Sequence, residues 1–401
     1  MVSLSPSELA TATGHPPVSD DHGRGHASGH AGVHQASPHG EALTTSDAPS
    51  SGDDPADRAD IGLLEGLVGI ESLSGAEDAA VGYLVGAMAE RGFETHIDPA
   101  GNAVGTIGSG KRRIVLLGHI DTVPGRIPVR IADGVLHGRG SVDAKGPLAT
   151  FVAATTRAAD RLNATVTVVG AVGEETMGSP GASEVATWPT PDACVIGEPS
   201  AWDALCLGYR GTLSLRYELV RDGRHSAGPG HTVAEEAIRF WARLEAEIDR
   251  RNAGSTRDFE RIGRSLRSFK TAGDGLADTA SLAIGLRLPP DTGGDELVAM
   301  ARDLAEDATV TSDGHQHAYR TDKRSPLVPP YLRAIRAEGG TPRFTVKLGT
   351  SDMSVVGPAW GCPIVAYGPG DASLDHTPEE RLPLDDYLRA VRVLERVLVA
   401  L

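Results

Sequence analysis

The sequence predicts an α/β fold in which a doubly wound domain is interrupted by a smaller inserted α+β domain. Uninterrupted apolar runs at residues 114–117 and 165–172 are typical of strands buried on both faces of a sheet. These runs alternate with segments of helical periodicity, which is the pattern of doubly wound proteins. From residue 212, strands of alternating apolar and polar residues indicate an antiparallel sheet with one exposed face.

The doubly wound part begins with two helices. Apolar residues recur at helical spacing from Leu63 to Ile70 and again over residues 77–91, where Gly92 follows at the position of a helix-ending glycine. Apolar and turn patterns then predict short strands at 93–97 and 103–107, a helix at 144–159, a short helix at 179–186 and a buried strand at 193–196.

The inserted domain is predicted as strand, helix, strand, helix, strand, at residues 212–219, 231–249, 279–288, 296–306 and 309–317. We expect the polar segment 252–276 to be a mobile loop. The first pattern then returns, with helices at 327–338 and 384–398 and strands at 344–346 and 363–367. The chain therefore divides into a tail at 1–58, a main domain in two parts at 59–210 and 321–401, and the insert at 211–320.

The tail differs in composition from the rest of the chain. Residues 1–58 are rich in Ser, Gly, Pro, Asp and Ala, and such a segment cannot bury enough apolar surface to offset its ordering entropy. It carries six of the 14 histidines, which leaves two interpretations open: a metal-collecting tract or a disordered, dispensable extension. The composition favours the disordered extension.

Charge and composition exclude several classes of function. The formal net charge of −16 argues against nucleic acid or an anionic membrane as a partner, because both demand a basic face. The sequence has no apolar run of about 18 residues and does not open with a secretory signal, so we expect no membrane span. Three widely spaced cysteines favour buried free thiols in a reducing compartment, and we expect a cytoplasmic protein.

Polar side chains gather where the apolar strands end. A single histidine or carboxylate there would be a core residue or a helix cap, but seven groups at successive strand ends indicate a site. Converging carboxylates repel one another unless cations are present, and two imidazoles with several carboxylates suit two Zn²⁺ ions, with Co²⁺ or Mn²⁺ in their place. The seven residues are His119, Asp121, Asp143, Glu174, Glu175, Glu198 and His376.

Two of these carboxylates need not bind metal. Asp121 is placed to orient the imidazole of His119, because a carboxylate that accepts a hydrogen bond from a ligating histidine fixes its tautomer. Glu174 stands beside a candidate ligand and can act as a general base, taking a proton from water and returning it to the leaving amine.

The motifs around these residues resemble the M20 family of dinuclear zinc peptidases and deacylases. The resemblance covers residues 60–401 and rests on residues 118–124 (GHIDTVP), 138–146 (GRGSVDAKG), 173–175 (GEE), 197–199 (GEP) and 376–379 (HTPE). It implies a doubly wound α/β catalytic domain with a mixed central sheet, into which an α+β dimerisation, or lid, domain is inserted.

The resemblance also assigns the metal ligands. His119 and Glu198 would hold one ion, and Glu175 and His376 the other. Asp143 would bridge them, and a cis peptide bond would follow it. A glutamate at the position of Glu198 accompanies deacylases and carboxypeptidases more often than aminopeptidases.

The inserted domain resembles the part of the family through which two subunits associate, which implies a homodimer. Residues 223–229 match the segment whose histidine reaches the partner subunit's active site, so His225 would help to stabilise the oxyanion there. Without the resemblance, His225 would be read as a surface histidine before a helix.

Within the family, the closest resemblance is to hydrolases that release lysine or ornithine from the C-terminal glutamate of an acidic amino-group carrier protein. It recurs in residues 119–130, 142–148, 196–200, 208–211, 349–353 and 368–377. Two departures are Ser354, where the resemblance predicts asparagine, and the absence of a proline at 70–75. A deacetylase of N-acetylornithine, another small-molecule deacylase or dipeptidase, and a non-catalytic homologue remain open.

Several residues are candidates for binding substrate carboxylates. They are Arg287, Lys347, Thr350 and Ser351, and for the two basic residues a surface ion pair is the alternative. Basic residues that cluster in sequence near the expected mouth of the site are candidates for docking the carrier, and a solvated charged loop is the alternative. They are Lys111, Arg112, Arg113, Arg126 and Arg130.

Overall fold

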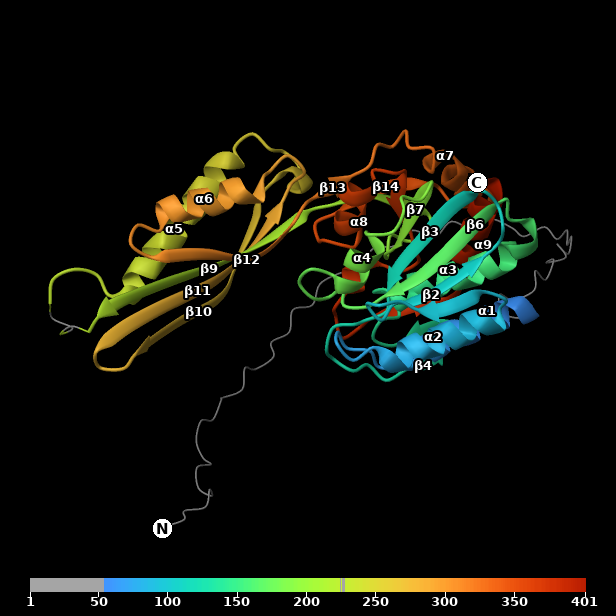
Figure 1. Ribbon diagram of the computed structural model, residues 1–401, viewed down its shortest axis with the longest axis horizontal. Helices are drawn as coiled ribbons and strands as arrows, with labels where there is room; N and C mark the ends of the chain where they lie inside the picture. The colour runs from blue at the N-terminus through green and yellow to red at the C-terminus, as the bar shows by residue number, and fades with distance from the viewer. Residues whose placement is uncertain (1–53, 224, 226–227) are drawn as a thin grey trace, which may run out of the picture. The chain divides into compact units, whose positions relative to one another are not determined.

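The structure is a computed structural model that describes residues 54–223, 225 and 228–401 (Figure 1). The predicted tail therefore lies outside the described residues, except at its end. Helix α1 (Pro55–Val68) begins there, because the Asp54 side chain accepts a hydrogen bond from the Ala56 amide at 2.9 Å and Pro55 suits a first helical turn. Asp57 then pairs with Arg157 of a later helix at 2.7 Å, so residues 55–58 belong to the fold.

The larger sheet is mixed, as predicted. Its strand order is β1-β2-β6-β3-β7-β15-β8-β13, and β14 also pairs with β8. The central pairs β6–β3, β3–β7 and β7–β15 are parallel, whereas β1–β2, β2–β6 and β15–β8 are antiparallel. The strands are β1 (Glu94–Ile97), β2 (Ala103–Ile107), β3 (Arg112–His119), β6 (Ala164–Ala171), β7 (Ala193–Gly197), β8 (Ala204–Tyr209), β13 (Tyr319–Arg320), β14 (Arg343–Lys347) and β15 (Ile364–Ala366).

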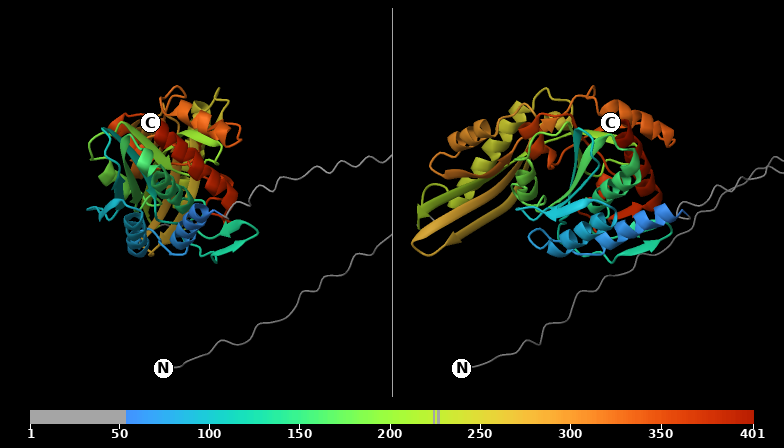
Figure 2. Two further views of the ribbon diagram at one scale, coloured as in Figure 1. Left: turned by 90° about the vertical axis from the view of Figure 1, so that its right-hand side faces the viewer. Right: turned by 45° about the vertical axis from the view of Figure 1, so that its right-hand side comes forward.

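Helices cover both faces of this sheet, which is the doubly wound arrangement. Ile114 and Leu116 of β3 belong to one buried cluster with α1, α2, α3, α7 and α9, and Val115 and Leu117 belong to another with α4 and α8. This two-sided burial explains the uninterrupted apolar run. Helices α3 and α9 lie side by side (Figure 2). The further helices are α2 (Asp78–Glu90), α3 (Lys145–Ala158), α4 (Pro180–Val185), α7 (Val328–Ala337), α8 (Met353–Trp360) and α9 (Leu384–Ala400).

The inserted segment forms a second sheet with its own core. Strands β10, β11, β9 and β12 pair antiparallel in that order, and α5 and α6 lie on one face (Figure 1). Leu213, Leu215, Tyr217 and Leu219 alternate along β9 and bury themselves against the helices. The elements are β9 (Gly211–Asp222), α5 (Val233–Arg251), β10 (Gly263–Gly273), β11 (Ala277–Leu288), α6 (Gly294–Leu304) and β12 (Thr309–Gln316).

The prediction of a mobile loop at 252–276 is wrong, because residues 263–273 of this segment form β10 and residues 258–260 form a 3-10 segment. Its pattern is weak because β10 is an edge strand with a β-bulge between Leu266 and Ser268, which interrupts the alternation of side chains. Asp274 also builds the turn into β11 by accepting hydrogen bonds from the amides of Leu276 and Ala277, both at 2.8 Å. The strand is therefore specified by its neighbour and its turn.

A small third sheet joins distant parts of the main domain. It consists of β4 (Arg130–Ala132), β5 (Val135–His137) and β16 (Arg381–Pro383), in the order β16-β5-β4. Short 3-10 segments at Ala159–Arg161, Asp258–Glu260 and Ala372–Leu374 complete the described elements. The three cysteines are free, and Cys194 and Cys206 are buried as predicted. Among the described residues, the helices are too short or too polar to cross a bilayer.

Candidate active site

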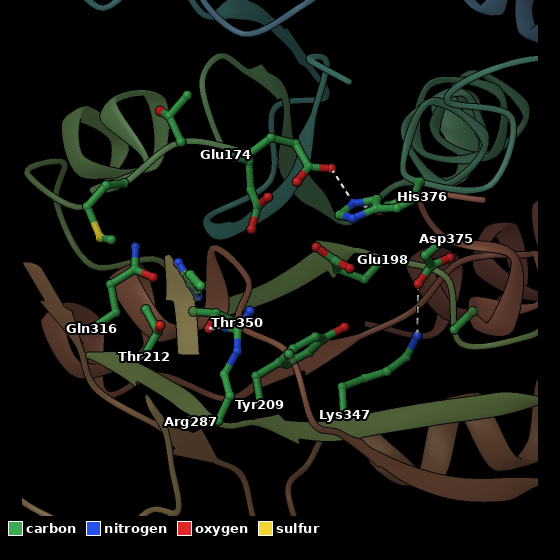
Figure 3. Close-up of a pocket in the computed structure, with 17 residues that line it drawn as sticks. Glu174, Glu198, Tyr209, Thr212, Arg287, Gln316, Lys347, Thr350, Asp375 and His376 are labelled. Atoms are coloured by element: carbon green, nitrogen blue, oxygen red, sulfur yellow. Dashed lines mark hydrogen bonds and ion pairs between the residues drawn. The ribbon is translucent and has the colours of Figure 1, made fainter. Parts of the chain in front are cut away.

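Six of the predicted site residues lie together at the carboxyl ends of the central strands, and Figure 3 shows three of them, Glu174, Glu198 and His376, around one cavity. Strands β6, β3 and β7 are parallel neighbours, so their carboxyl ends lie side by side, at the end of the strands where open α/β sheets bind ligands. The residues are His119 at the end of β3, Asp143 before α3, Glu174 and Glu175 after β6, Glu198 after β7, and His376 after the 3-10 segment Ala372–Leu374.

Two candidate ligand groups share Asp143. One consists of His119, Asp143 and Glu198, the other of Asp143, Glu175 and His376, and the ligand atoms of each group lie within 4.8 Å of one another. His119 Nε2 is 3.3 Å from Asp143 Oδ1, and His376 Nε2 is 3.0 Å from Asp143 Oδ2. One carboxylate thus faces both imidazoles, which is how a bridging ligand must lie. The peptide bond between Asp143 and Ala144 is cis, as the resemblance implies.

The charges of the site fit bound cations. Burial raises the pKa of Glu198 well above its usual range, and the neighbouring carboxylate of Asp143 raises it further. Burial also opposes ionisation of Asp143, but hydrogen bonds from His119 and His376 outweigh it and lower its pKa. Hydrogen bonds to Asp143 and Glu175 raise the pKa of His376 to about 10. Divalent ions would replace these protons and relieve the repulsion between the carboxylates, so the donor set suits two such ions.

His119 has one ring nitrogen free to bind metal. Its Nδ1 lies 3.0 Å from the backbone carbonyl oxygen of Asp121 and 3.5 Å from the Asp121 carboxylate. A proton on Nδ1 is therefore donated mainly to the carbonyl, and a bound metal ion would take the place of the Nε2 proton that is donated to Asp143 in its absence. The contact with Asp121 predicted from the sequence exists, but the backbone oxygen of that residue is the nearer acceptor.

The Asp121 carboxylate also holds the neighbouring loop. It accepts hydrogen bonds from the backbone amides of Glu174 and Glu175, both at 3.0 Å, and from the Ser74 hydroxyl at 2.7 Å. The side chain is fully buried. Asp121 therefore fixes the position of the candidate base and of a candidate ligand. Sequence reasoning missed this role, because the contacts join residues far apart in the chain.

Glu380 is a second residue that sequence reasoning missed. It is 1% exposed and accepts hydrogen bonds from the backbone amides of Val142 and Asp143, at 2.9 and 3.0 Å. Its other oxygen pairs with Arg139 at 2.7 Å. Glu380 thus positions the candidate bridging residue. The only signal in the sequence is that a second glutamate directly follows Glu379, the last residue of the 376–379 motif.

A cavity of about 470 Å³ opens beside these groups. Figure 3 shows Arg287 and Lys347 reaching into it from the wall that faces Glu174 and His376. Arg287 Nη1 donates to the Thr350 hydroxyl at 2.5 Å, and Lys347 lies 3.7 Å from Asp375. Three of the four predicted substrate-binding residues therefore line the cavity. Further lining residues are Thr176, Met177, Tyr209, Thr212, Arg267, Gln316, Gly349, Ala372 and Asp375.

Two predicted residues lie elsewhere. Ser351 is only 1% exposed and is absent from the cavity wall, and its hydroxyl accepts a hydrogen bond from the Met353 amide at 3.2 Å, at the start of α8. His225 is exposed, beyond the end of β9, and does not line the cavity of its own chain; residues 224, 226 and 227 lie outside the described residues.

The predicted cluster of basic residues is divided by the fold. Arg112 and Arg113 stand at the start of β3, so the whole strand separates them from His119 at its other end. Arg112 donates to the carbonyl of Leu401, and Arg113 to that of Thr190 at 2.8 Å. The prediction that residues 111–113 lie near the mouth of the site is therefore wrong. They are close to the His119 motif in sequence, but the extended strand β3 places them at the opposite end from it. Arg126 lines a separate cavity of about 240 Å³, and Arg130 lies in β4.

The fold and the two candidate ligand groups that share Asp143 together indicate a hydrolase with a candidate metal site. Residues 115–400 match peptidase family M20/M25/M40, and the chain belongs to this family. The chain is similar to the [LysW]-lysine hydrolase of Deinococcus radiodurans, with 46% identity over 84% of this chain and 96% of the relative. It is 30% identical, over 70% of this chain and 79% of the relative, to the [LysW]-lysine/[LysW]-ornithine hydrolase of Sulfurisphaera tokodaii.

Solved structures share the fold. An M20 metallo-carboxypeptidase from Sulfolobus solfataricus aligns with a TM-score of 0.70 and 16% identity, over 85% of this chain and 98% of the other. A dinuclear metal-binding M20 peptidase from Bacillus subtilis aligns with a TM-score of 0.65 and 13% identity, over 86% and 98%. The chain is thus an M20 hydrolase with a mixed α/β sheet.

Proposed function

We propose that the protein is a metal-dependent amidohydrolase that releases lysine or ornithine from the C-terminal glutamate of an acidic amino-group carrier protein. The observation that carries the reaction is the pair of His–carboxylate groups that meet at Asp143, with Glu174 beside them. The substrate is proposed from the names of the similar relatives, which act on LysW conjugates.

The side chains of this site divide the work between binding and proton transfer. His119 with Glu198, and Glu175 with His376, would hold two ions, Zn²⁺ or Co²⁺, on either side of Asp143. Bound ions of this kind polarise a carbonyl and lower the pKa of water. The backbone oxygen of Asp121 contacts Nδ1 of His119, and its carboxylate accepts a hydrogen bond from the amide of Glu174, in the loop that carries the base.

Glu174 is the proposed general base. It belongs to neither group that contains Asp143, although it approaches His119 and Glu175. Burial raises the pKa of Glu174 well above the usual range against the lowering effect of His119, and the repulsion of nearby carboxylates such as Asp352 raises it further. A carboxylate whose pKa is raised in this way accepts a proton from water more readily and can then deliver it to the leaving amine.

The remaining parts of the proposal concern assembly and location. We propose that the insert pairs two copies of the chain and that His225 serves the partner subunit's site. The free cysteines fit a reducing compartment, which we propose is the cytoplasm.

The experiment gives the purified full chain, loaded with Zn²⁺ or Co²⁺, three substrates: a carrier with lysine on its terminal glutamate, the same carrier with ornithine, and free N-acetylornithine. We expect turnover of at least one carrier conjugate and little of N-acetylornithine. Efficient turnover of N-acetylornithine with no release from either conjugate would contradict the proposal and identify a small-molecule deacylase.

The same assay tests the base. Glu174→Gln should keep its metal content, measured by elemental analysis, and lose about 10²- to 10⁴-fold in kcat. Near wild-type kcat in this variant would remove Glu174 from the mechanism.

A further inference from the structure

Two arginines share one wall of the cavity. Arg287 comes from β11, and Arg267 comes from the neighbouring strand β10. The pairing of these strands runs from Leu266 opposite Ile284 to Ser268 opposite Ala283, so Arg267 is the extra residue of a β-bulge. Bulges next to active sites commonly redirect a side chain. Here the bulged residue is Arg267, whose side chain lines the cavity.

A glycine leaves room for the Arg267 side chain. A Cβ atom built on Gly285 of β11 would lie 2.4 Å from Arg267 Nε and 2.7 Å from Cζ, so a side chain at this position would displace the Arg267 guanidinium. The guanidinium therefore lies directly over the glycine backbone. A bulge in one strand and a glycine in the next together leave room for Arg267 at the cavity wall.

The two guanidinium groups have no acidic partner within the described residues. Arg287 donates to the Thr350 hydroxyl, and no ion pair involves either arginine. Other arginines of the insert are paired: Arg216 with Asp313 at 3.2 Å and Arg264 with Asp249 at 2.6 Å. Burial and the charge of Arg267 both lower the pKa of Arg287, whereas Glu174 acts in the opposite direction. Adjacent cations of this kind are stabilised by an anionic ligand.

We propose that Arg267 is a second carboxylate-binding residue beside Arg287, and that the pair selects substrates with a carboxylate on each side of the scissile amide. This inference rests on the proposed function. An amino acid joined to the side chain of a terminal glutamate leaves two free α-carboxylates, one on the acyl part and one on the leaving amine. N-Acetylornithine has only one. A single arginine satisfies one carboxylate with a bidentate contact, so two arginines match the carrier-linked substrate.

The test measures binding, so that it does not depend on turnover. Glu174→Gln protein loaded with Zn²⁺ is titrated by calorimetry with Nα-(γ-glutamyl)-lysine and with the same compound whose glutamyl α-carboxyl is a primary amide. We expect the dicarboxylate to bind about ten- to a hundredfold more tightly than the amide. Adding Arg267→Gln should abolish this preference by weakening only the dicarboxylate.

Two further variants separate the charge of Arg267 from its position. Lys270→Gln removes a positive charge from the same strand outside the cavity, and it should keep the preference. Gly285→Ala keeps the charge but occupies the space of the guanidinium, and it should reduce the preference. The inference is overturned if the Glu174→Gln protein shows no preference, or if Arg267→Gln weakens both ligands equally. Wild-type turnover of carrier conjugates tests the proposed function separately, since it does not enter this comparison.

Discussion

Single residues in this site hold one another in place through the backbone. The Asp121 carboxylate accepts hydrogen bonds from the backbone amides of Glu174 and Glu175, and the Glu380 carboxylate accepts one from the amide of Asp143. That the candidate ligands lie close together could be predicted from the sequence, because polar residues at the ends of buried parallel strands converge. The positioning roles of Asp121 and Glu380 could not be predicted, because a carboxylate that accepts hydrogen bonds from backbone amides has no characteristic sequence pattern.

Glu380→Gln tests this kind of support. The amide side chain can accept only through its single oxygen, and Arg139 loses its anionic partner. We expect metal affinity to fall about 10- to 100-fold, as for other residues that orient ligands, measured by competition with a chelator. Glu379→Gln changes the exposed neighbour and should leave affinity unchanged. Equal effects of the two substitutions would show that Glu380 has no orienting role.

At the scale of elements, buried strands were the most predictable. The apolar run of β3 follows from its burial between two helical layers. Strand β10 was missed because it is an edge strand with a bulge, and the β4-β5-β16 sheet was missed because its strands have three residues each. Arg267 escaped notice for the same reason as β10: its position depends on the bulge and on Gly285 in the next strand.

The contact between α7 and α9 should make stability depend on pH. Burial of Glu338, at the end of α7, opposes its ionisation, but hydrogen bonds from Arg392 and Arg396 of α9 outweigh it and lower its pKa below 4.5. The contact therefore contributes its full stabilisation above pH 4.5, the ordinary pKa of a glutamate, and this stabilisation is lost as the pH falls through the lowered pKa of Glu338.

Glu338→Gln should lower the free energy of unfolding by about 1 kcal/mol near neutral pH, since the arginines are partly exposed. The difference from wild type should shrink below about pH 4. Urea unfolding at both pH values, with chelator present throughout so that metal loss does not contribute, measures it. If the free energies of unfolding of the variant and the wild type differ by the same amount at both pH values, the effect is due to packing instead.

For the whole molecule, the proposed dimer predicts that activity can be shared between subunits. A mixture of His225→Ala and Glu174→Ala proteins contains heterodimers with one complete site, formed by Glu174 of one subunit and His225 of its partner. Random pairing makes half of the dimers mixed, so the mixture should recover about a quarter of wild-type kcat. The double variant mixed with Glu174→Ala provides the control and should stay inactive. No recovery in the first mixture, despite demonstrated subunit exchange, would exclude a site in trans.

The residues of the candidate site are also synthesised in a fixed order. A growing chain emerges N-terminus first, so His119, Asp143, Glu175 and Glu198 are made long before His376 and Glu380. The strand that follows Glu380 pairs with β5, and the last helix, α9, packs on α3. A nascent or C-terminally truncated chain thus holds one ligand group but not the other. Under the proposed mechanism, hydrolysis therefore requires a chain that has been synthesised at least through His376 and Glu380.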